Sequence, residues 1–255
     1  MKIKKISLLV LFVLTLVSCS NGDKNQLVDF PLAIVSNAFP LGTDNIQGQT
    51  PIDIVTSSTV KMTSIDPVIH YSSVVLSNVQ NTVENLKINL SDVDKAANYI
   101  TIRGFKYELQ QFHFHHHSEH SINGTYGEME IHFVNKSASG AYAVLGVIVK
   151  DGATNSSLQT LIDDSPSAEG INEYVDSFNL SSILPLETNK YYSYSGSLTT
   201  PNMDLTPNQG PLTWFVFKNN ITLTAAQLEE YKVKYVEENF RVIQPLNNRK
   251  VYENN

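Results

Sequence analysis

Short apolar segments separated by polar turns recur along the chain from about Val55 onward. Each segment is only a few residues long and is rich in Val, Ile, Leu and Tyr, which is typical of strands. The clearest of them are 74–76, 99–102, 129–134 and 143–149. Asn123-Gly124, between two such segments, is the strongest short signal for a hairpin turn. The pattern predicts a predominantly β domain.

Two segments have helical periodicity instead. Residues 156–163 carry apolar positions three and four apart. Thr224 and Gln227 have the form of a capping box, which opens a run to about Glu237 with apolar positions on one face. Neither segment carries obvious chemistry, so we expect both to be packing elements.

The beginning of the chain has a different character. Three lysines precede the apolar run 6–17, which is too short to cross a bilayer comfortably but suits a secretory signal. The run ends in Leu-Val-Ser-Cys19, which resembles the bacterial lipobox, whose cysteine is lipidated and becomes the new N-terminus. A plain signal peptide that happens to contain a cysteine is the alternative.

This interpretation divides the chain into three parts. We expect a lipoprotein signal peptide over 1–18, a lipidated polar tether over 19–30 and one domain over 31–255. The protein would then be an exported bacterial lipoprotein, anchored to a membrane through Cys19 and either periplasmic or on the cell surface. Stable anchoring needs more than one acyl chain, which the multiply acylated cysteine of such lipoproteins supplies.

Composition narrows the possible chemistry. The 255 residues are 42% hydrophobic and 17% charged, as in globular proteins. Without residues 1–18, 15 Lys and Arg face 25 Asp and Glu, a net charge near −10 that argues against nucleic acid as a partner. Cys19 is the only cysteine. Therefore the domain has neither an internal disulfide nor a cysteine nucleophile or metal ligand.

The candidate chemistry lies in two of the apolar segments. Because residues two apart on a strand share a face, Gln111, His113 and His115 point to one side, and Glu130 and His132 share a face of the later segment. If Asn123-Gly124 folds the two segments together, three imidazoles converge. Three neutral nitrogens leave a tetrahedral Zn²⁺ one open position, as in catalytic sites.

The polar neighbours of these histidines strengthen the hypothesis. Gln111 and Glu130 lie on the same face as the histidines, where each can accept the second ring N–H of a ligand and fix its tautomer. Two plainer interpretations stay open: a histidine-rich tract that binds metals loosely, and isolated strand histidines that are satisfied polar residues.

These segments resemble α-class carbonic anhydrases. The resemblance extends from about 48 to 251 through separate motifs, namely Gln49-Thr-Pro-Ile, Gln111-Phe-His-Phe-His, Ser118-Glu-His, Glu128-Met-Glu-Ile-His-Phe-Val, Tyr192-Ser-Tyr-Ser-Gly-Ser-Leu-Thr-Thr-Pro, Leu212-Thr-Trp and Asn239-Phe-Arg. It implies a large, mostly antiparallel twisted β-sheet with short peripheral helices, in the mainly β or α+β class. It also implies reversible hydration of carbon dioxide to bicarbonate and a proton, by attack of zinc-bound hydroxide.

The resemblance assigns roles position by position. It implies His113, His115 and His132 as zinc ligands, supported by Gln111, Glu130 and the backbone carbonyl of Asn239. Thr199 would accept a hydrogen bond from the hydroxide and pass its own proton to Glu119. A substrate pocket is implied at Val134, Val144, Leu198, Thr200 and Trp214. Anionic and sulfonamide inhibitors are expected to bind.

The chain departs from the family in its proton route and near its N-terminus. Glu84 stands at the position of the family's cavity histidine, and a carboxylate is a poorer proton shuttle at pH 7 than an imidazole. His116 and His117 replace residues that are usually not histidine. Three interpretations stay open for them: solvent-exposed groups, which we favour, substitute proton carriers, or ligands of a second metal. His70 has no assigned role, and a structural one is favoured. The family's early aromatic segments are absent.

Two other classes of function remain as alternatives. One is a carbonic-anhydrase-like module that binds zinc or another ligand with little or no activity. The other is a zinc esterase or hydrolase acting on a larger substrate. A module kept only for binding does not require Glu119 and Thr199 together with three histidines, and a narrow apolar wall disfavours a large substrate.

Overall fold

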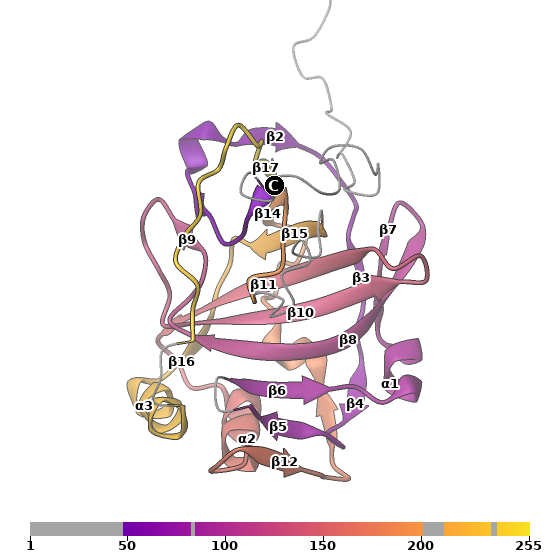
Figure 1. Cartoon of the computed structure of the whole chain (residues 1–255), viewed down its shortest axis with the longest axis vertical. Helices are drawn as coiled ribbons and strands as arrows, with labels where there is room; N and C mark the ends of the chain where they lie inside the picture. Colours follow the sequence, from indigo (N-terminus) through magenta and orange to yellow (C-terminus); the bar gives the residue numbers. More distant parts are fainter. Residues whose placement is uncertain (1–47, 83–84, 201–211, 236–238) are drawn as a thin grey trace, which may run out of the picture.

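A large mixed sheet forms the centre of the molecule, and short helices lie at its periphery (Figure 1). The computed structural model describes residues 48–82, 85–200, 212–235 and 239–255. Ten of the sheet's 13 strands form one continuous path. In order they are β12 (Gly170–Asn172), β5 (Val79–Asn81), β6 (Leu86–Asn89), β8 (Phe105–His116), β10 (Met129–Ser137), β11 (Tyr142–Asp151), β15 (Leu212–Phe217), β14 (Tyr191–Gly196), β17 (Tyr252–Asn254) and β2 (Val60–Met62).

The remaining elements flank this path. The other strands of the large sheet are β16 (Ile221–Leu223), paired with β11, and β7 (Tyr99–Ile102), which joins β3 (Val68–His70) to β8. Two small sheets pair β1 (Asp53–Ile54) with β9 (Ser121–Ile122) and β4 (Ser73–Val75) with β13 (Ser177–Asn179). The helices are α1 (Asp92–Ala97), α2 (Ser156–Asp164), α3 (Ala225–Lys234) and the 3-10 turns η2 (Thr56–Ser58) and η3 (Leu180–Ile183). The predicted fold class is confirmed.

Alternation along the two long central strands separates two buried layers. Phe112 and Phe114 of β8 and Phe133 of β10 belong to the main hydrophobic core. The residues between them face the other side of the sheet, where a smaller cluster forms around Val134 and Trp214. The histidines therefore lie on the face of the smaller cluster, as the alternation predicts.

Both predicted helices are present, and each begins immediately after the polar residue that caps it. The Asn155 side chain accepts the Leu158 N–H at the start of α2. At α3 the hydroxyl of Thr224 and the side chain of Gln227 form the predicted capping box. Helix α3 ends at Lys234, earlier than the predicted limit near Glu237, which lies outside the described residues.

The predicted turn at Asn123-Gly124 is present, but it does not join the two histidine strands directly. Both residues have positive φ, 51° and 73°, and the turn links Ile122 to Thr125 at the tip of a longer connection between β8 and β10. Strand β9 within this connection pairs with β1, a segment from much earlier in the chain. The prediction of adjacent antiparallel strands was therefore correct, and the simple hairpin was wrong.

Among the described residues, no helix is long and apolar enough to span a membrane. The predicted signal peptide, Cys19, the tether and Glu84 lie outside the described residues.

Candidate metal centre

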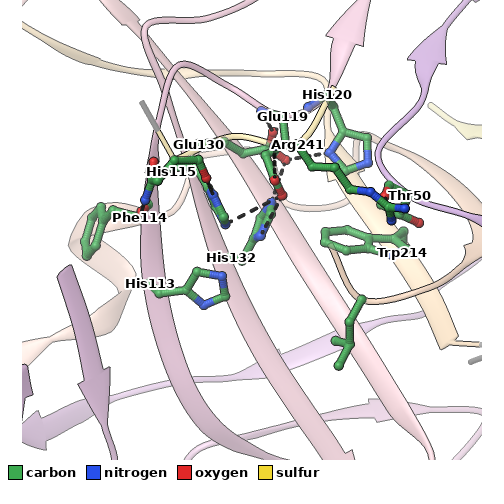
Figure 2. Close-up of polar contacts among 12 residues, drawn as sticks. Thr50, His113, Phe114, His115, Glu119, His120, Glu130, His132, Trp214 and Arg241 are labelled. Atoms are coloured by element: carbon green, nitrogen blue, oxygen red, sulfur yellow. Dashed lines mark hydrogen bonds and ion pairs between the residues drawn. The ribbon is translucent and has the colours of Figure 1, made fainter. Parts of the chain in front are cut away.

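Three buried imidazoles meet where β8 and β10 pair. The ladder places His132 opposite His113 and Glu130 opposite His115. The ring centroids are 4.9 Å apart for His113 and His115, 5.2 Å for His113 and His132, and 4.6 Å for His115 and His132. One nitrogen from each ring lies within 4.8 Å of the other two. Figure 2 shows the rings turned toward a common space.

Each ring has an inner nitrogen, which faces the other two rings, and an outer nitrogen, which faces away from them. The outer nitrogen of each ring has a polar neighbour. Nδ1 of His113 is 2.8 Å from Oε1 of Gln111, and Nδ1 of His115 is 2.8 Å from the backbone oxygen of Asn239. Nε2 of His132 lies 3.1 Å from Oε1 of Glu130, although it is not well aligned for a hydrogen bond. Because acceptor oxygens hold the protons on these outer nitrogens, the lone pairs are on Nε2 of His113 and His115 and on Nδ1 of His132.

Electrostatics favours neutral rings at two of the three positions. Burial lowers the pKa of His113 well below its ordinary value, and the neighbouring His115 lowers it further. The pKa of His115 is also lowered, chiefly by burial. Burial acts in the same direction on His132, but the combined attraction of the Glu130 and Glu119 carboxylates outweighs it and raises that pKa. The buried Nε2 of His115 has no hydrogen-bond partner among the described residues. Such an unpaired inner nitrogen fits a metal ligand.

Glu130 holds the surroundings of the centre together. Its Oε2 accepts the backbone N–H groups of Glu119 and His120 at 2.9 and 2.8 Å, and its Oε1 is 2.7 Å from Nδ1 of His120. Burial alone would raise the pKa of Glu130, but the charges of His120 and His132 hold it well below the ordinary value. The fully buried side chain is therefore a carboxylate.

A second possible ligand group, His120, Glu130 and His132, lies wholly within this network and shares only His132 with the three-histidine group. Both ring nitrogens of His120 are already paired, since His120 bonds Glu130 through Nδ1 and lies 2.7 Å from the hydroxyl of Tyr194 through Nε2. The three-histidine group is the better candidate for a metal, because one nitrogen of each ring lies within 4.8 Å of the other two and the buried Nε2 of His115 has no hydrogen-bond partner among the described residues.

A cavity of about 260 Å³ opens beside the histidines. Every residue predicted for the substrate pocket lines it: Val134, Val144, Leu198, Thr200 and Trp214. His113, His132, Gln111 and Thr199 line it as well. The candidate metal centre thus adjoins a wall that is mainly apolar, with polar groups at its inner end.

Glu119 and Thr199 lie near the centre, but no hydrogen bond joins Oε2 of Glu119 to Thr199 among the described residues. Oε1 of the buried Glu119 accepts the backbone N–H of Arg241 at 2.8 Å. Its Oε2 is 3.6 Å from Nε2 of His115 and has no hydrogen-bond partner among the residues that the structure describes. The hydrogen bond to Thr199 that the resemblance implies is thus not formed within that part of the chain, although the acceptor oxygen is available.

The other histidines lie outside the cavity lining. His116 approaches the Tyr231 ring of α3, with centroids 6.5 Å apart. His117, with a positive φ of 57°, lies 4.4 Å from the Tyr126 ring. His70 stacks on Tyr99 at 4.5 Å, in agreement with a structural role.

Reasoning from the sequence missed three cavity residues. Gln110, Lys136 and Tyr142 line the same cavity as the metal centre. Lys136 and Tyr142 continue the alternation that begins at His132 and Val144, so the pattern contained the signal. Gln110 lies next to Gln111, and no strand periodicity places neighbouring residues on one face.

Comparison with known proteins gives one consistent result. The model of the eukaryotic-type carbonic anhydrase family matches residues 40–255. A carbonic anhydrase of Klebsiella pneumoniae is 36% identical over 82% of this chain and 81% of its own length. A carbonic anhydrase of a Nostoc species is 34% identical over 80% of this chain and 75% of its own length. The α-carbonic anhydrase of Thermovibrio ammonificans, solved with the inhibitor sulfanilamide, is 34% identical with a TM-score of 0.74 over 81% of this chain and 87% of its own.

Proposed function

The chain belongs to the eukaryotic-type carbonic anhydrase family, and we propose that it hydrates carbon dioxide reversibly with a zinc ion held by His113, His115 and His132. The observation that carries this proposal is the convergence of three inner ring nitrogens beside an apolar cavity, with a polar group at each outer nitrogen. Zinc is the ion that best suits three imidazoles with a remaining open position.

The chain's own residues prepare the reaction. A zinc ion in this site supplies a Lewis acid that lowers the pKa of its water ligand to about 7, the established value for carbonic anhydrases. Gln111, Glu130 and the Asn239 carbonyl hold the rings in the required tautomers and orientation. Their fixed positions mean that little reorganisation is needed when charge develops during the reaction.

Thr199 and Glu119 direct the attacking oxygen. The Thr199 hydroxyl would accept a hydrogen bond from the nucleophile and would donate its own proton to Oε2 of Glu119, the buried oxygen that lacks a partner among the described residues. This arrangement turns a lone pair of the nucleophile toward carbon. Glu119 stays in place because its other oxygen is fixed by the Arg241 N–H.

The apolar wall binds the substrate. Carbon dioxide has no net charge and is a weak electrophile, so a dry pocket beside the nucleophile favours it over water. Val134, Val144, Leu198 and Trp214 form this wall, and the Trp214 indole N–H is fixed by the Ser197 carbonyl at 2.9 Å. With zinc bound, the net reaction would convert carbon dioxide and water to bicarbonate and a proton.

Stopped-flow hydration of carbon dioxide by the metal-free and zinc-loaded protein tests this proposal. We expect turnover only with zinc, and its loss on addition of a sulfonamide. A zinc-loaded but inert protein would favour the binding module. Zinc-dependent ester hydrolysis without hydration would favour the esterase.

Thr199→Ala tests the assigned role within the same assay. Removal of one transition-state hydrogen bond typically costs about 100- to 1,000-fold in rate. We expect hydration to slow on that scale while the zinc content stays equal to that of the wild type, because Thr199 is not a metal ligand. Parallel loss of zinc and activity would contradict the role.

We also propose that the mature chain begins at a lipidated Cys19. The charged start, the apolar run 6–17 and the Leu-Val-Ser-Cys sequence support export and anchoring. In a bacterial host, the wild type should partition into detergent with acylated Cys19 in its N-terminal peptide. Cys19→Ala should abolish both. A wild-type chain without the lipid would contradict the anchor and favour a plain signal peptide.

A further inference from the structure

The cavity wall formed by β10 and β11 consists of three successive pairs of residues with different chemistry. His132 is opposite Gly146, Val134 is opposite Val144, and Lys136 is opposite Tyr142. Because the residues that line the wall are two apart, Lys136 lies roughly 13 Å along the strand from His132. The wall therefore runs from the metal centre through an apolar pair to a mouth that carries a cation.

A β-bulge adds a further polar residue at this mouth. Between β8 and β10 the register passes from Gln111 opposite Val134 to Leu109 opposite Asn135, so Gln110 has no partner in the ladder. A bulge turns an extra side chain toward one face, and both Gln110 and Gln111 line the cavity. The bulge thus makes the mouth more polar next to Lys136.

The ammonium group of Lys136 is held at the mouth without a carboxylate partner among the described residues. It lies 5.0 Å from the centroid of the Tyr142 ring, which fixes the side chain along the cavity wall. The acidic residue opposite it on β8 is Glu108, whose Oε1 bonds Lys106 at 3.0 Å. Within the described part of the chain Lys136 makes no ion pair, so its charge is available to an occupant of the cavity.

We propose that Lys136 is a specificity-determining residue that makes the cavity mouth select for anionic groups. This inference rests on the proposed function, because it concerns occupants that reach the zinc through this mouth. Two kinds of occupant fit: bicarbonate passing through the mouth, and an aromatic sulfonamide with a negative substituent at its outer end. The apolar pair contacts the ring of such a sulfonamide, and Lys136 attracts the substituent.

Three benzenesulfonamides of similar size test the proposal on the zinc-loaded protein. Their para substituents are a carboxylate, a carboxamide and an aminomethyl group, which are negative, neutral and positive at pH 7.5. Calorimetry gives the dissociation constants for the wild type, Lys136→Met and Lys150→Met. Lys150 is a matched control, because it is an exposed lysine of β11 that does not line this cavity. For each compound we compare the ratio of its dissociation constants in the variant and in the wild type. This ratio removes the effect that the substituent has on the sulfonamide group itself, because that effect is the same in both proteins.

We expect Lys136→Met to weaken binding of the carboxylate compound about two- to fivefold relative to binding of the carboxamide compound. This is the effect of losing a partly exposed ion pair. The aminomethyl compound should bind more tightly by a similar factor, and both changes should shrink as salt is raised. Lys150→Met should change none of the ratios. Equal ratios in the wild type and Lys136→Met, or equal changes in both variants, would overturn the proposal. Failure of the wild type to bind the neutral sulfonamide would instead contradict the proposed function.

Discussion

Replacement of Glu130 by glutamine should damage the metal centre although the side chain keeps its shape. In the wild type, both carboxylate oxygens accept, one from two backbone N–H groups and the other from His120 Nδ1, with His132 Nε2 3.1 Å away. Glutamine offers only one oxygen. If its NH₂ faces the two rings, His132 must accept through Nε2 and carry its proton on Nδ1. Because Nδ1 is the nitrogen that faces the metal, this tautomer opposes binding.

The size of the effect follows from the hydrogen bonds that glutamine is unable to accept. Removal of the acceptor behind a metal ligand typically weakens metal binding 10- to 100-fold, or about 1.4–2.7 kcal/mol. In the opposite amide orientation the NH₂ faces two buried backbone N–H groups, which then lack an acceptor. Either orientation should lower the free energy of unfolding of the metal-free protein by about 2–5 kcal/mol.

Zinc affinity measured by competition with a chelator at pH 7.5, and urea unfolding of the metal-free protein, check both numbers. Glu108→Gln on the neighbouring strand β8 is the matched control, since Glu108 is partly exposed and its ion pair with Lys106 lies at the surface. It should change either quantity by less than about 0.5 kcal/mol. A folded Glu130→Gln protein that binds zinc as tightly as the wild type would refute the reasoning.

Two further substitutions test other parts of the account. A Cβ at Gly146 would lie 2.8 Å from Oε1 of Glu130. Gly146→Ala should therefore lower the free energy of unfolding in urea by about 1–3 kcal/mol and weaken zinc binding in the chelator assay. Unchanged values would contradict this packing. Burial alone would raise the pKa of Glu253, but hydrogen bonds, foremost from Lys218, lower it to about 2. Its stabilisation is present above the ordinary pKa of 4.5 and is lost as the pH falls toward 2. Glu253→Gln should therefore cost about 2 kcal/mol at neutral pH, with the difference disappearing on acidification; a constant difference would show that Glu253 does not act through its charge.

The sequence predicted the faces of the central strands because their periodicity is local. Gln111, His113 and His115 alternate with phenylalanines that enter the main core, so burial fixed the register and turned the histidines to the other side. The capping box of α3 was recognisable for the same reason, since all its atoms lie within one turn of helix.

Interactions between distant parts of the chain were not accessible in this way. Asn239 is 124 residues from His115, and only the resemblance to a family suggested that its carbonyl supports that ring. The bulge at Gln110 depends on how β8 and β10 pair, and the pairing of β9 with β1 depends on a segment far back in the chain. Tertiary pairing, which has no local signature, decides these features.

A crystal structure of the zinc-loaded protein, with anomalous diffraction at the zinc edge, tests the central claim most directly. We expect one zinc ion bound by Nε2 of His113, Nε2 of His115 and Nδ1 of His132 at about 2.0–2.1 Å, with a fourth ligand that does not come from the protein. Zinc bound by His120 and Glu130 instead, or a protein side chain at the fourth position, would contradict the account.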